Sequence, residues 1–244
     1  HADIASRIGL GKSIPVVVGG GDNQMSMLGS GLNSPASPAL LNIGTAAQIS
    51  MISNEYIRVP GVDTRSFFGG AYALVAASLA GGGSYQWLRE LIQAERGVKI
   101  TYAEMDHLAA QVPPGADCLV FCPGPTRERL ERKMGFFGNR LHQSSIGHQA
   151  RAVIEGVLLD LYELYLGMRA YNNCEIMVGA GKGLQRSSVW SQVAADIFGK
   201  PLRITHFENA LFGAALTAAV GVGAIEKLEA GVGSIQYDQQ IFPQ

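Results

Sequence analysis

The 244 residues are 47% hydrophobic and 16% charged, and the formal net charge is −1. This composition indicates a globular α/β protein with a substantial core, and without a block of lysines and arginines it gives no sign of a nucleic-acid or anionic-membrane partner. The longest apolar stretch, residues 211–225, has 15 residues, fewer than the roughly 18–20 that a membrane span needs, so we expect no membrane partner.

In its first half the chain alternates between short apolar runs and segments of helical spacing. The predicted elements are a strand over 15–19, a helix over 23–29, a hairpin of strands 39–42 and 46–52, a strand over 71–78, and helices over 84–93 and 101–111. Glycine-rich corners separate several of them, and a Pro-Pro-Gly run ends the last.

The second half is dominated by one long amphipathic helix, predicted over 148–171. Its apolar stripe is Val153, Val157, Leu161, Leu164 and Met168, and its polar face is Arg151, Glu155, Asp160 and Glu163. Around it we predict a buried strand over 118–122, a polar loop over 123–132, strands over 175–179 and 201–205, and helices over 187–198 and 209–223. This alternation predicts a single domain with a sheet covered by helices.

A carboxylate follows the first predicted strand in the run Gly-Gly-Gly-Asp-Asn-Gln, residues 19–24. Asp22 opens the next helix, and one interpretation is an ordinary N-cap, for which aspartate is a preferred residue. The other interpretation is a general base at the end of a strand, which accepts the proton of a substrate hydroxyl during phosphoryl transfer. The local pattern alone does not choose between them.

Three further glycine motifs could approach a phosphate or a flat base. The turn at Gly44 and Thr45 offers backbone and hydroxyl donors, the run 81–83 precedes the helix that contains Gln86, and the run 178–183 (Val-Gly-Ala-Gly-Lys-Gly) joins a strand to a helix. Each motif is equally compatible with a plain turn or connection.

Taken in order, these motifs resemble the second domain of the FGGY family of carbohydrate kinases, over nearly the whole chain. The resemblance implies a ribonuclease-H-like domain of the actin/hexokinase ATPase superfold, with ATP and Mg²⁺ as cofactors and a small-molecule sugar as the second substrate. It implies a catalytic role for Asp22, a sugar contact for Asn23, and nucleotide contacts for Gly44, Thr45, Gly82, Gln86, Gly181 and Ser187.

Within the family the chain resembles the sedoheptulokinase branch, through the run 42–50, the loop at 126–130, and the long glycine loop that carries Arg186 and Ser187. Xylulose, ribulose and glycerol kinases remain alternatives, as does a non-catalytic nucleotide-binding module. Met134 departs from the family pattern, which has a small residue there.

Family members are about twice this length. We therefore expect residues 1–244 to be the C-terminal nucleotide-binding domain, with the sugar-binding N-terminal domain absent and the isolated chain inactive. The chain begins with His1 rather than methionine, which fits that expectation. Many members are dimers, so a homodimer is possible.

The cysteines and histidines give no indication of a metal site. Cys118, Cys122 and Cys174 form no Cys-x-x-Cys pair, and the five histidines show no His-x-x-x-His spacing. We expect Cys118 and Cys122 to be small buried residues on one face of a strand. Unpaired cysteines and the absence of a signal-peptide pattern in the opening residues favour a cytoplasmic location.

Overall fold

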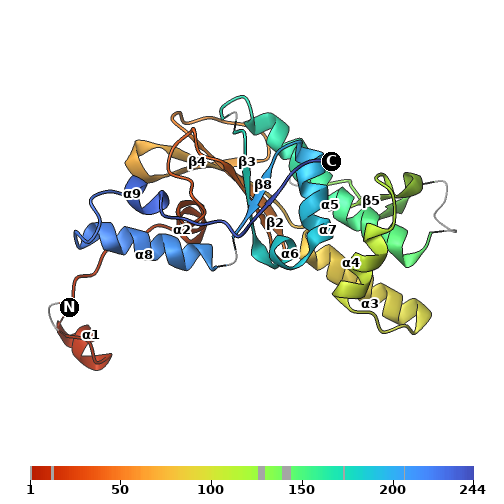
Figure 1. Ribbon diagram of the computed structural model, residues 1–244, viewed down its shortest axis with the longest axis horizontal. Helices are drawn as coiled ribbons and strands as arrows, with labels where there is room; N and C mark the ends of the chain where they lie inside the picture. Colours follow the sequence, from red (N-terminus) through yellow and green to blue (C-terminus); the bar gives the residue numbers. More distant parts are fainter. Residues whose placement is uncertain (1, 12–13, 126–129, 139–143, 173, 206) are drawn as a thin grey trace.

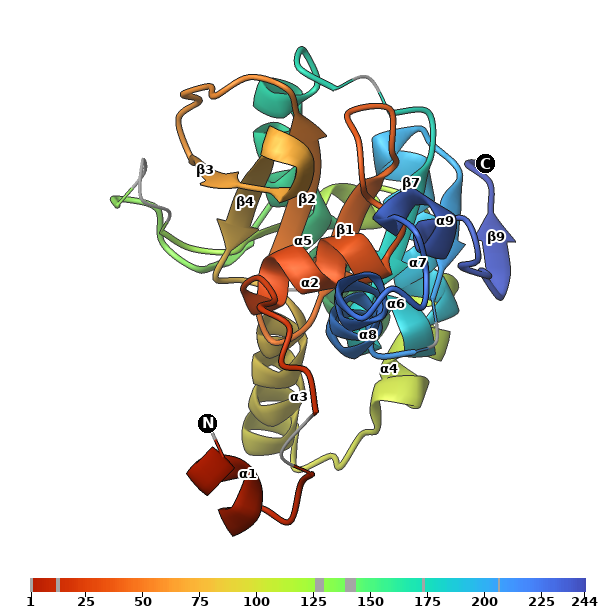
Figure 2. The ribbon, with the colours of Figure 1, turned by 90° about the vertical axis from the view of Figure 1, so that its left-hand side faces the viewer.

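The structure is a computed structural model that describes residues 2–11, 14–125, 130–138, 144–172, 174–205 and 207–244. Within these residues, seven strands form one mixed sheet in the order β3-β4-β2-β1-β7-β8-β9 (Figures 1 and 2). Their bounds are β1 Ala39–Ile43, β2 Ala47–Ser53, β3 Val62–Ser66, β4 Tyr72–Ser78, β7 Met177–Ala180, β8 Leu202–Ile204 and β9 Gln239–Ile241. A separate ribbon pairs β5 Val120–Cys122 with β6 Gly135–Phe137.

The pairing of the sheet brings distant motifs together. β1, β2, β4 and β3 are antiparallel neighbours, whereas β1, β7 and β8 are parallel, with Asn42 opposite Ala180. Because parallel strands end at the same edge, the turn after β1 and the glycine loop after β7 meet there, where ligands bind in open α/β sheets. The predicted α/β class and the predicted hairpin are confirmed.

Helices cover both faces of the sheet. Their bounds are α1 Ala2–Arg7, α2 Asp22–Gly29, α3 Gly82–Arg96, α4 Tyr102–Ala110, α5 Ile146–Met168, α6 Gly181–Arg186, α7 Ser188–Phe198, α8 Asn209–Gly221 and α9 Leu228–Val232, with single 3₁₀ turns at Phe68–Gly70 and Ala116–Cys118. Figures 1 and 2 show α2 and α8 on one face and α5 and α7 on the other, with α1 away from the rest. Among the described residues, no helix has the length and apolarity to cross a bilayer.

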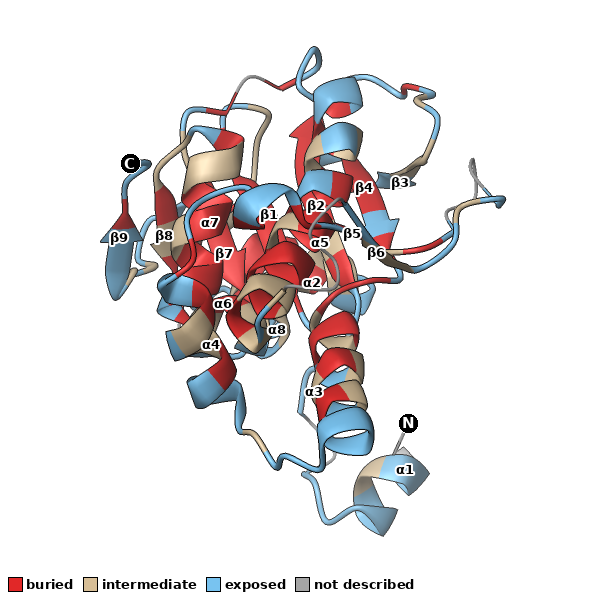
Figure 3. Cartoon of the chain, turned by 90° about the vertical axis from the view of Figure 1, so that its right-hand side faces the viewer, coloured by how far each residue is buried: buried red, intermediate tan, exposed pale blue. Residues whose placement is uncertain are grey.

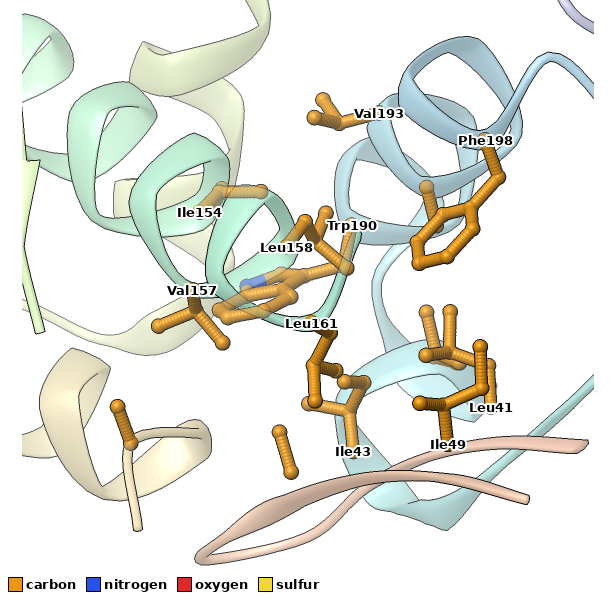
Figure 4. Close-up of a cluster of buried hydrophobic side chains, with 14 of the residues drawn as sticks. Leu41, Ile43, Ile49, Ile154, Val157, Leu158, Leu161, Trp190, Val193 and Phe198 are labelled. Atoms are coloured by element: carbon orange, nitrogen blue, oxygen red, sulfur yellow. The ribbon is translucent and has the colours of Figure 1, made fainter. Parts of the chain in front are cut away.

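Alternation along the strands divides the core into two layers. Odd-numbered residues of β1 pack under α5 and α7, whereas Leu40 packs with Met27 of α2 on the opposite face. Figure 3 shows the buried centre between these layers. In the larger layer, side chains of the sheet, α5 and α7 interdigitate (Figure 4): Leu41, Ile43, Ile49, Ile154, Val157, Leu158, Leu161, Trp190, Val193 and Phe198.

The predicted strand over 15–19 is wrong. This segment has no strand assignment, and Val16 and Val18 are 89% and 88% exposed. Between them, Val17 points inward, because its side chain lies against Gly221 at the end of α8. The β-branched residues do alternate as in a strand, but a strand needs a partner for its backbone, and none of the described residues supplies one.

The strand predicted over 118–122 begins two residues later, at Val120. The backbone of Ala116, Asp117 and Cys118 is left-handed (φ of 45°, 51° and 68°) and closes a 3₁₀ turn, in which Cys118 N–H donates to Gly115 O at 2.8 Å. Cys118 is consequently exposed and Cys122 half-buried, against the expectation that both are buried.

The long helix is confirmed as α5, with its apolar stripe against the sheet. Its predicted polar face is partly wrong, because Arg151 and Asp160 are buried. Asp160 is paired with Arg132 at 2.7 Å, and Arg151 with Glu155 at 2.6 Å. These two positions therefore face protein and not solvent. The charges are tolerated there because each is paired with an opposite charge. Residues 126–129 of the predicted loop, and with them most of the run 126–130, lie outside the described residues.

Candidate functional site

A cleft of about 810 Å³ opens at the edge of the sheet where β1 and β7 end, a size typical of small-molecule sites. Its walls come from α2, the β1–β2 turn, α3, α4, the loop and helices after β7, and the start of α8. Of the residues predicted for a site, it contains Gly44, Thr45, Gly82, Gln86, Gly181 and Ser187. Segments that are more than 100 residues apart in the sequence are thus brought into one cavity.

The floor of the cleft is a contact between the β1–β2 turn and the first turn of α3. Gly82 N–H donates to Gly44 O at 2.8 Å, Gly83 N–H donates to Thr45 O at 2.9 Å, and Gly44 N–H donates to Ala46 O at 3.0 Å. These amides therefore already have acceptors and are not donors for a ligand. Among the residues that the structure describes, the exposed Thr45 hydroxyl has no hydrogen-bonding partner, and it is the donor that this turn offers to the cleft.

The loop after β7 comes close to β1 because of a glycine. Gly181 has a φ of +82°, and a Cβ there would lie 2.5 Å from both Asn42 Oδ1 and Ile43 O. A side chain could occupy neither that backbone conformation nor that space without strain. From Gly181 the chain continues directly into α6, which was not predicted, and Lys182 adds a cationic side chain to the cleft wall.

Aromatic rings form another part of the wall. Tyr85 and Trp190 are buried and meet edge to face at 5.7 Å, while Tyr102 stacks on Tyr85 at 6.0 Å. Arg89 lies over the Tyr102 ring, 4.3 Å from its centroid. These flat apolar surfaces are suited to a planar group such as a nucleobase.

Asp106 of α4 lies among these rings and lines the cleft. Its Oδ1 accepts a hydrogen bond from Tyr85 Oη at 2.9 Å, and the Ser187 hydroxyl is near enough to influence the pKa of the carboxyl. Burial raises the pKa of the Asp106 carboxyl, and the two hydroxyls act against that rise. Burial and the neighbouring carboxylate raise the pKa of Tyr85 as well. Sequence reasoning missed Asp106, because its helix carries no motif and only the packing of α4 against α7 brings it to the cleft.

Asp22 is the first residue of α2, after the N-cap Gly21. The N-cap interpretation of Asp22 is therefore wrong. Its carboxylate is exposed and accepts the N–H of Asn23 at 2.7 Å. Asp22 does not line the cleft, but Ser26, one turn further along the same helical face, does. The carboxylate thus lies on the helix face that leads into the cleft.

Asn23 points away from Asp22, toward the sheet. Its Nδ2 donates to Ser50 Oγ at 3.4 Å, and its Oδ1 is buried without a partner among the described residues. Gln86 is exposed at the cleft and donates to Glu90 at 2.9 Å. Ser187 accepts Trp190 N–H at 3.2 Å as the N-cap of α7.

A buried polar network lies behind the cleft and joins α8 to α2. Thr205 Oγ1 donates to Asn209 Oδ1 at 3.0 Å, and Asn209 Nδ2 donates to Ser30 Oγ. Asn209 also lines the cleft. No sequence motif marks this network, which depends on the close crossing of α2 and α8 at Gly29 and Gly213.

Among the described residues, no group of three or more His, Cys, Asp or Glu side chains could hold a metal ion. Of the described residues that line the cleft, Asp106 and Glu208 carry carboxylates, and they lie on different walls. Chemically, the site offers aromatic surface, a half-buried acceptor, an exposed hydroxyl and cationic side chains.

Comparisons with known proteins agree on one family. Residues 39–222 match the model described as "FGGY family of carbohydrate kinases, C-terminal domain". The chain is 30% identical to a xylulose kinase of Staphylococcus epidermidis over 99% of this chain and 49% of that protein, and 28% identical to a glycerol kinase of Myxococcus xanthus over 89% and 45%. It therefore spans about half the length of the curated relatives it matches.

Solved structures show the same fold. The xylulose kinase from Rhodospirillum rubrum superposes with a TM-score of 0.86 at 28% identity, over 100% of this chain and 50% of that one. The gluconate kinase from Lactobacillus acidophilus superposes with a TM-score of 0.87 at 23% identity, over 100% of this chain and 50% of that one. The expected ribonuclease-H-like domain of the actin/hexokinase ATPase superfold is confirmed. This chain belongs to the FGGY family of carbohydrate kinases.

Proposed function

We propose that this chain is the nucleotide-binding half of an ATP-dependent carbohydrate kinase, which transfers the γ-phosphoryl group of MgATP to a sugar hydroxyl. The observation that carries the proposal is the cleft at the end of β1 and β7, into which the three predicted glycine segments converge. The helix that begins at Asp22 enters the same cleft through Ser26.

The walls of the cleft fit the parts of a nucleotide. Tyr85, Tyr102 and Trp190 provide apolar surface for the base. The Thr45 hydroxyl and the Lys182 ammonium are donors that suit phosphate oxygens. Gly44, Gly82 and Gly181 contribute by packing the segments closely enough to form the cavity. Gln86 and Ser187 complete the nucleotide side of the site.

Asp22 is the group that would accept the proton of the attacking hydroxyl. Its exposed carboxylate has one hydrogen-bond partner among the described residues, the N–H of Asn23, so it keeps lone pairs for a substrate. Such catalysis depends mainly on positioning and charge stabilisation. Asn23 stays a proposed sugar contact, although its amide lies toward Ser50 here. Because no metal-holding cluster is found in the described residues, Mg²⁺ would arrive on the nucleotide phosphates.

The acceptor is proposed to be a ketose. A sedoheptulose-type sugar is supported by the long glycine loop that carries Arg186 and Ser187, and xylulose is the second candidate because relatives at 30% identity are named xylulose kinases. A ribulose, glycerol or gluconate acceptor would place the chain elsewhere in the family. A purely nucleotide-binding module of the same superfold would have no need for the carboxylate of Asp22.

The remaining half of the kinase is the proposed partner. The chain covers about half of its relatives, and Val16 and Val18 expose alternating β-branched side chains that a neighbouring strand could cover. We expect that half to supply much of the sugar pocket, so the 244 residues alone should be inactive. A homodimer and a cytoplasmic location, the latter supported by three free cysteines, belong to the same proposal.

The test is a coupled ADP-release assay on the full-length protein with a panel of ketoses, aldoses, glycerol and gluconate. Wild-type enzyme should phosphorylate one ketose preferentially, and Asp22→Asn should lower kcat by roughly 10²–10⁴. Asp63→Asn, the same change at a carboxylate of β3 whose side chain is 46% exposed, is the matched control and should keep normal turnover. Normal turnover in the Asp22→Asn enzyme would remove its assigned role, and nucleotide binding without turnover on any sugar would favour the non-catalytic module.

A further inference from the structure

One carboxylate in the aromatic part of the cleft is not explained by phosphate binding. Asp106 is half-buried, accepts a hydrogen bond from the Tyr85 hydroxyl at 2.9 Å, and has the Ser187 hydroxyl nearby, which acts against the rise that burial causes in the pKa of its carboxyl. A phosphate would be repelled there, whereas the Thr45 hydroxyl and the Lys182 ammonium on other walls suit an anion. The two parts of the cleft therefore differ in what they can bind, and Asp106 lies in the part with the ring surfaces.

The hydrogen-bonding capacity of this carboxylate is only partly used. An ionised carboxylate has about four acceptor positions, and the Tyr85 hydroxyl occupies one of them. A further N–H donor would be favourable, because burial raises the pKa of the carboxyl and each donor offsets that cost. In surroundings formed by Tyr85 and Trp190, an unmatched polar contact is costly.

We propose that Asp106 determines base specificity by accepting a hydrogen bond from the exocyclic 6-amino group of the bound purine. This inference rests on the proposed nucleotide site and adds a residue that selects the substrate. Adenine presents an amino donor at position 6, whereas hypoxanthine presents a carbonyl oxygen, which faces the carboxylate as a second acceptor. The site therefore takes adenine nucleotides in preference to 6-oxopurine nucleotides.

The test measures binding of ADP and IDP to the full-length protein by isothermal titration, because these two nucleotides differ at purine position 6. Wild type should bind ADP roughly tenfold or more tightly than IDP. Asp106→Asn keeps an oxygen acceptor for Tyr85 and adds an N–H donor, so the preference should fall to about equal or reverse. Asp63→Asn should leave the ADP/IDP ratio unchanged. If Asp106 had only a structural role, Asp106→Asn would weaken the binding of ADP and of IDP by the same factor.

A second arm needs no variant and covers the case in which Asp106→Asn fails to fold. N6,N6-dimethyl-ADP keeps the nitrogen but lacks both N–H donors, and wild type should bind it as weakly as IDP. Equal affinity of wild type for ADP and IDP, or an undiminished preference in Asp106→Asn, would overturn the inference while leaving the nucleotide site intact. Failure of all three nucleotides to bind would overturn the proposed function and this inference with it.

Discussion

Gly82 donates its backbone N–H to the carbonyl oxygen of Gly44 across 2.8 Å, and this bond joins the first turn of α3 to the β1–β2 turn. A Cβ on Gly82 would lie 2.8 Å from the same oxygen, closer than the 3.0 Å that real Cβ atoms keep. A Cβ on Gly181 would likewise lie too close to a backbone oxygen, 2.5 Å from Ile43 O. The glycine motifs of this cleft thus bring protein segments against one another, and the cavity between them is a consequence of that packing.

Gly181→Ala should therefore lower the free energy of unfolding by more than backbone strain alone. Its φ is +82° and its added methyl would lie 2.5 Å from Ile43 O, so we expect a loss of roughly 2–4 kcal/mol. Gly199→Ala is the control, since its φ is +61° with nothing within 4 Å, and should cost about 1 kcal/mol. Urea unfolding of both variants measures the difference, and equal losses would mean that the loop can relax away from β1.

The pair between Arg132 and Asp160 should contribute to stability. Arg132 Nη1 lies 2.7 Å from Asp160 Oδ1, and the two side chains are 21% and 4% exposed, respectively. Arg132→Ala leaves a buried carboxylate without its cation and should cost roughly 2–4 kcal/mol. Arg65→Ala removes the cation of a pair whose side chains are 43% and 46% exposed, and should cost about 0–1 kcal/mol. Thermal unfolding measures both losses. Equal losses of stability in Arg132→Ala and Arg65→Ala would contradict a larger contribution from the buried pair.

Sequence patterns predicted the elements whose signals are local. The β1–β2 hairpin has its own turn, and α5 has an apolar stripe along several turns, so both were found. The errors and omissions lie where the outcome depends on whether a partner strand is present. The segment 15–19 has strand-forming residues but no described strand beside it, and the short strands β3, β6 and β9 form only because another strand is there to pair with them.

The residues of the candidate site show the same difference between local sequence signals and tertiary contacts. Gly44, Thr45, Gly82 and Gly181 lie in glycine motifs that the sequence displays, and they do line one cleft. Asp106 has no motif of its own, and it reaches the cleft only because α4 packs beside α7. Its environment is a property of the tertiary structure, which a pattern within one helix cannot reveal.

Acid should weaken the start of α4. Thr101 donates its backbone N–H and its hydroxyl to Glu104 at 2.8 and 2.7 Å, and these bonds, the backbone one first, hold the pKa of Glu104 below its ordinary 4.5. A lowered folded pKa contributes stability that is present above the ordinary value and lost as pH falls through the folded one. Between about pH 6 and about pH 3, wild type should lose more stability than Glu104→Gln. Glu95→Gln on α3 is the control, and identical acid slopes for all three proteins would show that the hydrogen bonds between Thr101 and Glu104 contribute nothing to stability.

Thr45 offers the sharpest test of the phosphate side of the cleft. Its hydroxyl is exposed and, within the described residues, makes no hydrogen bond, so removing it should leave the free energy of unfolding within about 0.5 kcal/mol of wild type. Thr45→Val keeps the shape of the side chain and should raise the Kd for MgATP by about 5- to 10-fold, the effect of one lost hydrogen bond to a charged group. Thr45→Ser restores the hydroxyl and should bind as wild type does. Titration of the three full-length proteins decides the matter, because unchanged affinity in Thr45→Val would mean that the β1–β2 turn shapes the cleft without touching the phosphates.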